Sequence, residues 1–270
     1  MVLPQLYSFY SQIIQLRLLL LILFLSLSFS AQADWGKNGH RTIGQIASHY
    51  LKPKAKAKIK LLLGGKSLAV VSTFADEIKS DDRYDKFKPW HYANIPFDQT
   101  YSASEKNEEG DIVAGINKCI QVLKDQQSST KDKVFYLKML IHLMGDMHQP
   151  LHFGLKEDRG ANLFDVDWFG EDSNLHRVWD SEMIKTYDMS YTEMARNRTL
   201  LLPAERRKYR KGNLLDWVKE TRVLTQQVYD SADKGENLGY RYMYDWFDTL
   251  NLQLHKGGIR LAKILNKIFD

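Results

Sequence analysis

Three of the eight histidines of this protein lie within the stretch HLMGDMHQPLH, residues 142–152. The apolar periodicity upstream predicts a helix that reaches into this stretch, and residues four apart on a helix project on the same side. His142 and Asp146 form such a pair. Pro150 ends the helix, so His152 can turn back toward the same point from an irregular segment. Two imidazoles and a carboxylate arranged in this way predict a zinc cluster.

A second pair with the same spacing occurs in NLHRVWD, where His176 precedes Asp180 by four residues. Helix capping or surface hydrogen bonding would explain either pair alone. The two pairs together, with HQPLH attached to the first, favour metal binding over these structural roles.

Further candidate residues lie upstream. FADEIK places Asp76 and Lys79 near a predicted helix start, WHY contains His91, and WGKNGH contains His40. A solitary buried histidine such as His91 is more often a hydrogen-bonded core residue than a metal ligand. The interpretation of these residues as ligands therefore depends on the whole set.

The elements that would position these residues are predicted to be helices. Apolar residues recur at intervals of three and four, and this periodicity predicts helices at 40–51, 111–124, 131–147, 213–229 and 240–268. Alternation typical of strands is scarce, apart from NLFDVDWFG (162–170), which predicts at most a short β-hairpin. No Pro, Gly or Ser linker divides the chain after its N-terminal segment, so we expect a single all-α domain.

Several other patterns have structural explanations. KPKAKAKIKLLLGG predicts a basic amphipathic helix with a solvated lysine face, ended by Gly64 and Gly65. The run ERRKYRK (205–211) predicts a charged helix end or loop rather than a polyanion site. GGKS is not a phosphate-binding loop, because Lys60 stands where that motif needs glycine. Cys119 is the only cysteine, so no internal disulfide can form, and its helical context predicts burial.

The N-terminal segment predicts export. Arg17 precedes an apolar run from Leu18 to Phe29, followed by small residues with an Ala31-x-Ala33 spacing. This pattern is typical of a secretory signal peptide over residues 1–33, and the run is shorter than the roughly 20 residues that span a bilayer. We expect a secreted or periplasmic protein without a stable membrane anchor after processing, with cleavage after residue 33 or 34.

The ordered motifs WGKNGH, FADEIK, WHY, HLMGDMHQPLH, RGANLFDVDWFG and NLHRVWD resemble a known family. From Trp35 to the C-terminus the chain resembles the secreted three-zinc, single-strand-preferring type I nucleases, the group that includes mung bean nuclease. The resemblance implies a phospholipase C/nuclease-like helical domain over residues 35–270 with three Zn²⁺ ions per chain.

The resemblance also implies three ligand sets. They are Asp76, His91, His142 and Asp146 for one zinc; His152, His176 and Asp180 for a second; and Trp35, His40 and Asp146 for a third, with Asp146 bridging two ions. Trp35 would bind through its free amine and carbonyl, which favours Trp35 over Asp34 as the mature N-terminus. His49, His148 and His255 would be structural or surface groups.

The implied activity is endonucleolytic hydrolysis of phosphodiester bonds in single-stranded DNA and RNA by a monomer, yielding 5′-phosphates, with 3′-nucleotidase activity on nucleotides. Asp76 would be catalytic, and Lys79 would contact substrate and neutralise charge in the transition state. Tyr92 occupies the place of an aromatic base platform. Asn94 would hydrogen-bond the base where several relatives have aspartate. Ala161 replaces the second glycine that is usual in RGANL, a change expected to narrow the approach to the metals.

Two rival functions remain open from the sequence. A zinc-dependent phospholipase C typically ends its ligand set in glutamate and has a longer interval after its N-terminal tryptophan. Asp180 and the short Trp35 to His40 spacing favour the nuclease. A noncatalytic zinc-binding exported protein would need saturated coordination, whereas catalytic zinc keeps an open position.

Overall fold

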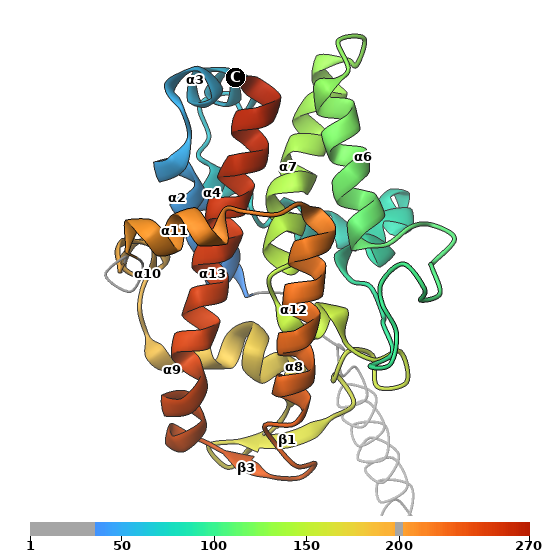
Figure 1. Ribbon diagram of the computed structural model, residues 1–270, viewed down its shortest axis with the longest axis vertical. Helices are drawn as coiled ribbons and strands as arrows, with labels where there is room; N and C mark the ends of the chain where they lie inside the picture. The colour runs from blue at the N-terminus through green and yellow to red at the C-terminus, as the bar shows by residue number, and fades with distance from the viewer. Residues whose placement is uncertain (1–35, 198–201) are drawn as a thin grey trace, which may run out of the picture. The chain divides into compact units, whose positions relative to one another are not determined.

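The described part of the chain is built mainly from helices, as predicted (Figure 1). The computed structural model describes residues 36–197 and 202–270, so the predicted signal peptide and Trp35 lie outside the described residues. The longer α-helices are α2 (Lys37–Tyr50), α3 (Pro53–Leu62), α6 (Ile112–Lys124), α7 (Thr130–Asp146), α12 (Leu214–Tyr229) and α13 (Tyr240–Phe269). The short α-helices are α4 (Leu68–Val71), α5 (Phe74–Glu77), α8 (Leu175–Arg177), α9 (Met183–Tyr187), α10 (Tyr191–Arg196) and α11 (Pro203–Tyr209). The remaining helical segments are η1 (Ile78–Ser80), η2 (Asp82–His91), η3 (Pro150–Phe153) and the π-helical turn η4 (Val178–Glu182).

Local signals explain where the long helices begin. The side chains of Asp111, Ser129 and Asn213 accept hydrogen bonds from backbone N–H groups in the first turns of α6, α7 and α12. Such caps satisfy donors that have no partner within the helix. The five long helices predicted from periodicity are confirmed, and α2 begins three residues earlier than expected, at Lys37.

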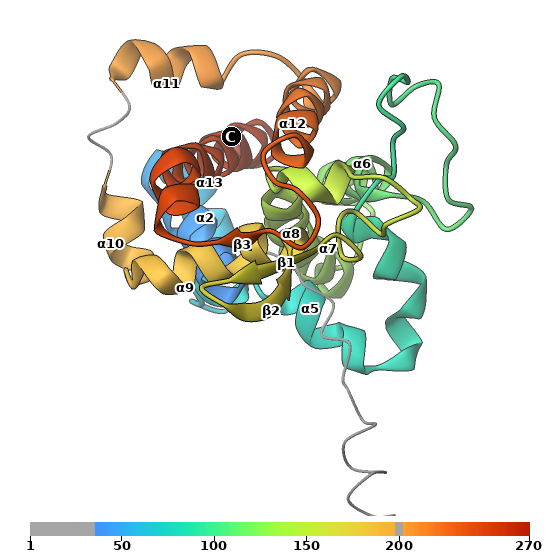
Figure 2. The same cartoon turned by 90° about the horizontal axis from the view of Figure 1, so that it is seen from below.

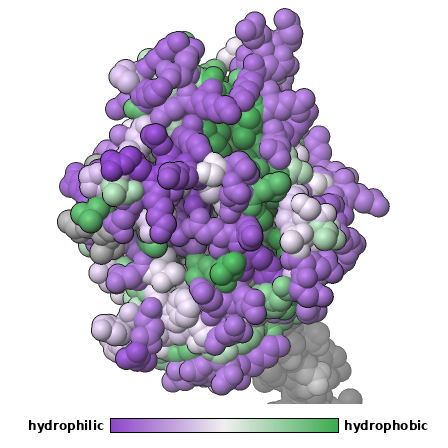
Figure 3. Space-filling view, in the orientation of Figure 1, coloured by the Kyte–Doolittle hydropathy of each residue, from purple (hydrophilic) through white to green (hydrophobic). Residues whose placement is uncertain are grey.

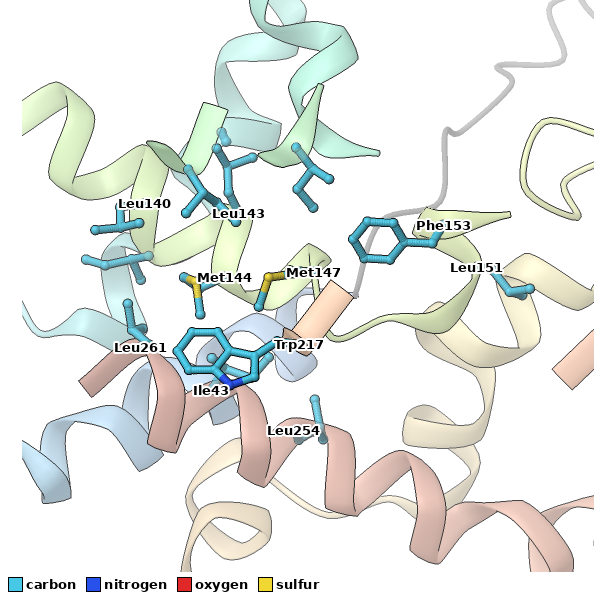
Figure 4. Packing of buried hydrophobic residues seen from close by; sticks show 14 of the residues in the cluster. Ile43, Leu140, Leu143, Met144, Met147, Leu151, Phe153, Trp217, Leu254 and Leu261 are labelled. Atoms are coloured by element: carbon cyan, nitrogen blue, oxygen red, sulfur yellow. The ribbon is translucent and has the colours of Figure 1, made fainter. Parts of the chain in front are cut away.

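The hydrophobic core forms where α2, α7, α12 and α13 meet (Figure 4). From α7 and the residue after it come fully buried Leu140, Met144 and Met147. They belong to the same buried cluster as Ile43 of α2 and Trp217 of α12. Because α7 ends in this packed region, its last turn is held rigidly, and that turn carries His142 and Asp146.

A small three-stranded sheet lies at one end of the helical bundle, the end that faces the viewer in Figure 2. Strand β1 (Asp165–Trp168) pairs antiparallel with β2 (Glu171–Asn174) and parallel with β3 (Asn237–Leu238). The predicted hairpin is therefore present, but it continues four residues beyond residue 170. The expectation of at most a hairpin was wrong, because a third strand of two residues joins the sheet from just before α13.

The basic segments have the structural roles expected of them. The lysines of α3 are exposed, and Gly64 and Gly65 follow the helix with positive φ values of 58° and 83°. The ERRKYRK segment lies largely on α11. The face of the molecule in Figure 3 is predominantly hydrophilic, which fits a solvated surface.

Cys119 is fully buried, as predicted, and burial raises the pKa of its thiol. All of the described residues belong to one compact unit. Across residues 36–197 and 202–270, no helix combines the length and apolarity that crossing a bilayer requires.

Helix α13 packs tightly on α2 at Gly258, and a substitution there should therefore change the stability of the protein. A Cβ atom at Gly258 would lie 2.4 Å from Cγ2 and 2.5 Å from Cβ of Ile46. Alanine would gain about 1 kcal/mol of helix propensity, but the overlap must be relieved by moving one helix. We expect Gly258→Ala to lower the free energy of unfolding by about 1–3 kcal/mol in urea denaturation.

Tyr244→Ala, at an 80 % exposed position of the same helix, is the control. It should change the free energy of unfolding by about 0.5 kcal/mol or less. An unchanged or more stable Gly258→Ala protein would contradict the close packing of α2 on α13.

Candidate metal centre

Eight side chains from distant parts of the chain meet in a buried cluster of histidines and aspartates. They form three groups whose possible ligand atoms lie within 4.8 Å of one another: His40, His142 and Asp146; Asp76, His91 and His142; and His152, His176 and Asp180. These are eight of the nine predicted ligands. The ninth, Trp35, lies outside the described residues.

The second of these groups is assembled around the last turn of α7. His142 Nε2 lies 3.3 Å from Asp76 Oδ1, on α5, and 3.1 Å from Asp146 Oδ2, one turn along α7. His91, the last residue of η2, places its Nδ1 2.8 Å from Asp146 Oδ2 and 3.2 Å from His142 Nε2. The predicted pairing of His142 with Asp146 is therefore present, and two short helices bring the other donors to it.

Asp146, a member of the group with His40 and His142, also contacts His91 of the second group. Its Oδ2 faces His91 and His142, whereas its Oδ1 lies 3.3 Å from His40 Nε2. The ring of His40 also stacks on that of His142, with centroids 3.9 Å apart. A carboxylate whose two oxygens face different sets of imidazoles has the geometry of a bridge between two metal positions.

The third group is formed by His152 of η3, His176 of α8 and Asp180 of the π-helical turn η4. His152 Nε2 lies 3.8 Å from Asp180 Oδ1, and His176 Nε2 lies 3.8 Å from Asp180 Oδ2. Local spacing alone predicted His152 as a partner of His142 and Asp146. The structure groups it with His176 and Asp180, as the family resemblance implied, and its Nδ1 also lies 3.8 Å from Asp146 Oδ1.

Backbone carbonyls fix the orientation of three imidazoles. In each, Nδ1 donates to a carbonyl, and the acceptors are Ser72 for His142 (2.7 Å), His91 for His152 (2.6 Å) and Gly160 for His176 (2.5 Å). A carbonyl can only accept, so Nδ1 carries the proton and Nε2 is turned toward the group. This second contact is how proteins orient metal-ligating histidines.

The electrostatics of the cluster favour a cation. Burial lowers the pKa of His40, and burial together with Lys79 lowers the pKa of His91 to about 3, so burial disfavours a proton on either ring. Burial opposes ionisation of Asp146, but His142 and His152 outweigh it and hold its pKa well below the usual value. For His142, burial is outweighed by the carboxylates of Asp146 and Asp76, which raise its pKa. A proton on His142 thus supplies positive charge between two carboxylates.

The donor set fits zinc. Within the described residues, both ring nitrogens of His40, Oδ1 of Asp146 and Oδ2 of Asp180 are buried without a hydrogen-bond partner. Burial of such atoms is unfavourable unless something binds them. Zinc bonds of about 2.0–2.1 Å at tetrahedral angles separate neighbouring ligand atoms by about 3.3 Å. The distances around His142 and His40 match this spacing, and those around Asp180 are slightly wider.

The residues predicted to act on substrate lie next to the cluster. Lys79 Nζ lies 3.2 Å from Asp76 Oδ1. Tyr92 is 39 % exposed and Asn94 is half-buried. The N–H of Ala93 donates to the carbonyl of His152, so the segment bearing Tyr92 and Asn94 runs beside the third group.

Ala161 is fully buried, and its φ of +63° lies in the region that favours glycine. Its effect on the approach to the metals stays a prediction. The remaining histidines are outside the three groups: His49 is exposed, whereas His148 and His255 are buried.

Two residues of the α7 terminus were missed by sequence reasoning, although both lie in the stretch HLMGDMHQPLH. Gly145 packs against His40, since a Cβ there would lie 2.6 Å from His40 Nδ1. Gln149 is fully buried and donates from Nε2 to Asp180 Oδ1 at 2.9 Å. For Gln149, the signal that the sequence offered was an amide side chain placed between Asp146 and His152, two predicted ligands.

The helical domain, with its groups of histidines and aspartates that could hold metal ions, fits the phospholipase C/nuclease-like fold class. A model of the S1/P1 nuclease family matches residues 35–270, so the chain belongs to this family and is a nuclease, a hydrolase of phosphodiester bonds. It is 29 % identical to Endonuclease 4 of Arabidopsis thaliana, over 87 % of this chain and 89 % of that protein.

Fungal relatives agree with this assignment. Nuclease P1 of Penicillium citrinum is 27 % identical over 87 % of this chain and 97 % of that protein. Nuclease S1 of Aspergillus oryzae is 31 % identical over 55 % of this chain and 54 % of that protein. The family match favours the nuclease over the phospholipase C alternative.

The tight contact of Gly145 with His40 gives a test of the cluster. Gly145→Ala places a methyl group against the imidazole, so His40 must move away from Asp146 Oδ1. We expect the protein to lose the metal equivalent bound by this group, while the group around Asp180 keeps its own. Metal analysis of the purified protein measures the loss.

Lys131→Ala, an exposed substitution on the same helix, controls for changes in α7 itself. Full metal content in Gly145→Ala would show that His40 is not needed for metal binding.

Proposed function

We propose that this nuclease is a zinc-dependent endonuclease that cleaves phosphodiester bonds of single-stranded DNA and RNA, leaves 5′-phosphates and has 3′-nucleotidase activity. One observation carries the proposal: three groups of histidine and aspartate adjoin one another, with His142 common to two of them and Asp146 Oδ1 3.8 Å from His152 of the third. Such adjacency suits several zinc ions acting on one phosphate. We assign three ions to the ligand sets named from the sequence.

Charge complementarity supports a phosphodiester substrate. Three zinc ions would carry +6, and the carboxylates of Asp76, Asp146 and Asp180 carry −3, which leaves +3 at the loaded site. Without metal, the same carboxylates would repel nucleic acid. Metal binding and substrate binding are therefore coupled.

The assignment of Trp35 as a ligand rests on its neighbour. The N–H of Gly36 donates to the carbonyl of Asp180 at 2.7 Å, which fastens the start of the described chain beside the cluster. A free amine at Trp35 is a better ligand than a peptide nitrogen. We therefore propose removal of residues 1–34, with secretion or periplasmic export of a monomer.

Asp76 and Lys79 have the placement that phosphoryl chemistry needs. Bound zinc would supply an activated water near neutral pH. The side chain of Asp76 is 28 % exposed, whereas the other clustered ligands are buried, so the site opens to solvent at this carboxylate. Lys79 Nζ is held 3.2 Å from Asp76 Oδ1, where its charge can stabilise negative charge developing on a phosphate.

Tyr92 and Asn94 supply base recognition in this proposal. Tyr92 presents part of its ring at the surface, directly after His91. An unpaired base can stack on such a ring, whereas a base within a duplex is covered on both faces. Preference for single strands follows from this geometry, and the Asn94 amide can donate to or accept from the base edge.

Activity should depend on zinc and on an unpaired nucleic acid. We expect the mature protein to cleave single-stranded DNA and RNA much faster than duplex DNA. A chelator should abolish cleavage, and added zinc should restore it. Gel assays, with phosphate analysis of the product ends, measure these outcomes.

Phosphatidylcholine as the substrate tests the phospholipase C alternative, and release of phosphocholine without nucleic acid cleavage would overturn the proposal. Asp76→Asn tests zinc storage. It should lose cleavage while keeping most of its metal, whereas equal, negligible activity in both proteins would favour storage.

Tyr92→Ala should weaken substrate binding more than turnover. Stacking on an aromatic ring contributes about 1–3 kcal/mol per base, so KM for a single-stranded oligonucleotide should rise about 5- to 150-fold, with kcat little changed. Steady-state kinetics measures the split. Tyr244→Ala, which removes an exposed tyrosine of α13, is the matched control, and an unchanged KM for Tyr92→Ala would refute the role.

A further inference from the structure

Gln149 is fully buried between the end of α7 and the turn that carries Asp180. Its Oε1 accepts from the N–H of Leu151 at 2.5 Å, and its Nε2 donates to Asp180 Oδ1 at 2.9 Å. The backbone N–H can only donate and the carboxylate can only accept. These two contacts leave one orientation for the amide, with its NH₂ group toward Asp180.

The same NH₂ group also faces His176, with 3.3 Å between the two Nε2 atoms. His176 donates from Nδ1 to the carbonyl of Gly160, so its Nε2 presents a lone pair. Gln149 has two N–H bonds, one for each neighbour. One amide therefore contacts two members of the third group, on either side of a metal position.

The hydrogen bond from Gln149 makes the two carboxylate oxygens of Asp180 different from each other. Oδ1 is engaged by Gln149, whereas Oδ2 is buried without a hydrogen-bond partner among the described residues and lies 3.8 Å from His176 Nε2. A carboxylate held through one oxygen cannot rotate freely. Gln149 thus leaves Oδ2 as the oxygen offered to a cation.

We infer that Gln149 is a positioning residue of the group formed by His152, His176 and Asp180. It holds Asp180 through Oδ1 so that Oδ2 and His176 Nε2 are presented together, and it releases His176 when a cation takes that lone pair. The inference rests on the zinc-binding role proposed above. It deepens that role by naming the group that orients two of the ligands.

The competing explanation is that Gln149 only caps η3 through Leu151. A cap stabilises the metal-free and metal-loaded protein equally, and it leaves zinc affinity unchanged. A positioning residue alters the affinity itself, so the stabilisation gained on adding zinc becomes smaller. The two roles are therefore separable by measuring affinity and stability together.

Gln149→Met keeps a side chain of similar length and removes the amide contacts with Leu151, Asp180 and His176. Gln253→Met is the matched control, since Gln253 is only 2 % exposed and lies on α13, outside the three groups. Zinc affinities are measured by competition with a chromophoric chelator, and melting temperatures are measured with and without zinc. We expect one zinc equivalent of Gln149→Met to bind about 10- to 100-fold more weakly, with the others unchanged, and Gln253→Met to retain every affinity.

Unchanged zinc affinities in Gln149→Met, with equal losses of melting temperature with and without zinc, would overturn the inference and leave the cap role. Failure of the unsubstituted protein to bind zinc would instead overturn the proposed function. The two failures are thus distinguishable.

A measurement on the unsubstituted protein covers the case in which Gln149→Met does not fold. Glutamine side chains labelled with ¹⁵N are followed by NMR during a zinc titration. The Gln149 amide signals should shift as the third group fills, while those of Gln253 stay in place. Gln149 signals that are insensitive to zinc would equally overturn the inference.

Discussion

The burial of Asp146 is the constraint on which the site depends. This carboxylate is fully buried at the end of α7, and its oxygens face His91, His142 and His40. A buried carboxylate is tolerated only where cations or hydrogen-bond donors surround it. The surrounding imidazoles can meet that need by holding protons or by sharing a metal, so the charge of Asp146 explains why histidines gather around it.

The packing of the helices fixes the positions of the histidines around Asp146. The last turn of α7 is held by core contacts, and Gly145 lets His40 approach it from α2. Carbonyls of Ser72 and Gly160 then turn His142 and His176 inward. Because these carbonyls lie in segments that are themselves anchored, imidazole orientation is a property of the fold and does not have to be created by the metal.

Sequence reasoning succeeded where the chemistry was local. The spacing of His142 and Asp146 fixes their common helical face, so the pair could be predicted from one segment. The partners of His152 depend on the direction of the chain after Pro150, which spacing does not specify, and its grouping with His176 and Asp180 was implied only by the family resemblance. The strand Asn237–Leu238 is too short to show alternation. Gln149 resembles a loop residue beside proline until its burial is known.

Metal binding offers this protein, whose single cysteine is buried, a way to join distant segments of its chain. The three groups join residues from α2, α5, η2, α7, η3, α8 and η4, which extend from residue 37 to residue 182 of the sequence. Ions bound there would cross-link these segments as disulfides do in many exported proteins, because binding that requires the folded arrangement stabilises it. Asp76 is 28 % exposed, whereas the other clustered histidines and aspartates are buried. The buried residues are thus the ones through which bound ions would couple to folding, and the edge at Asp76 is the one at which we propose that a phosphate binds.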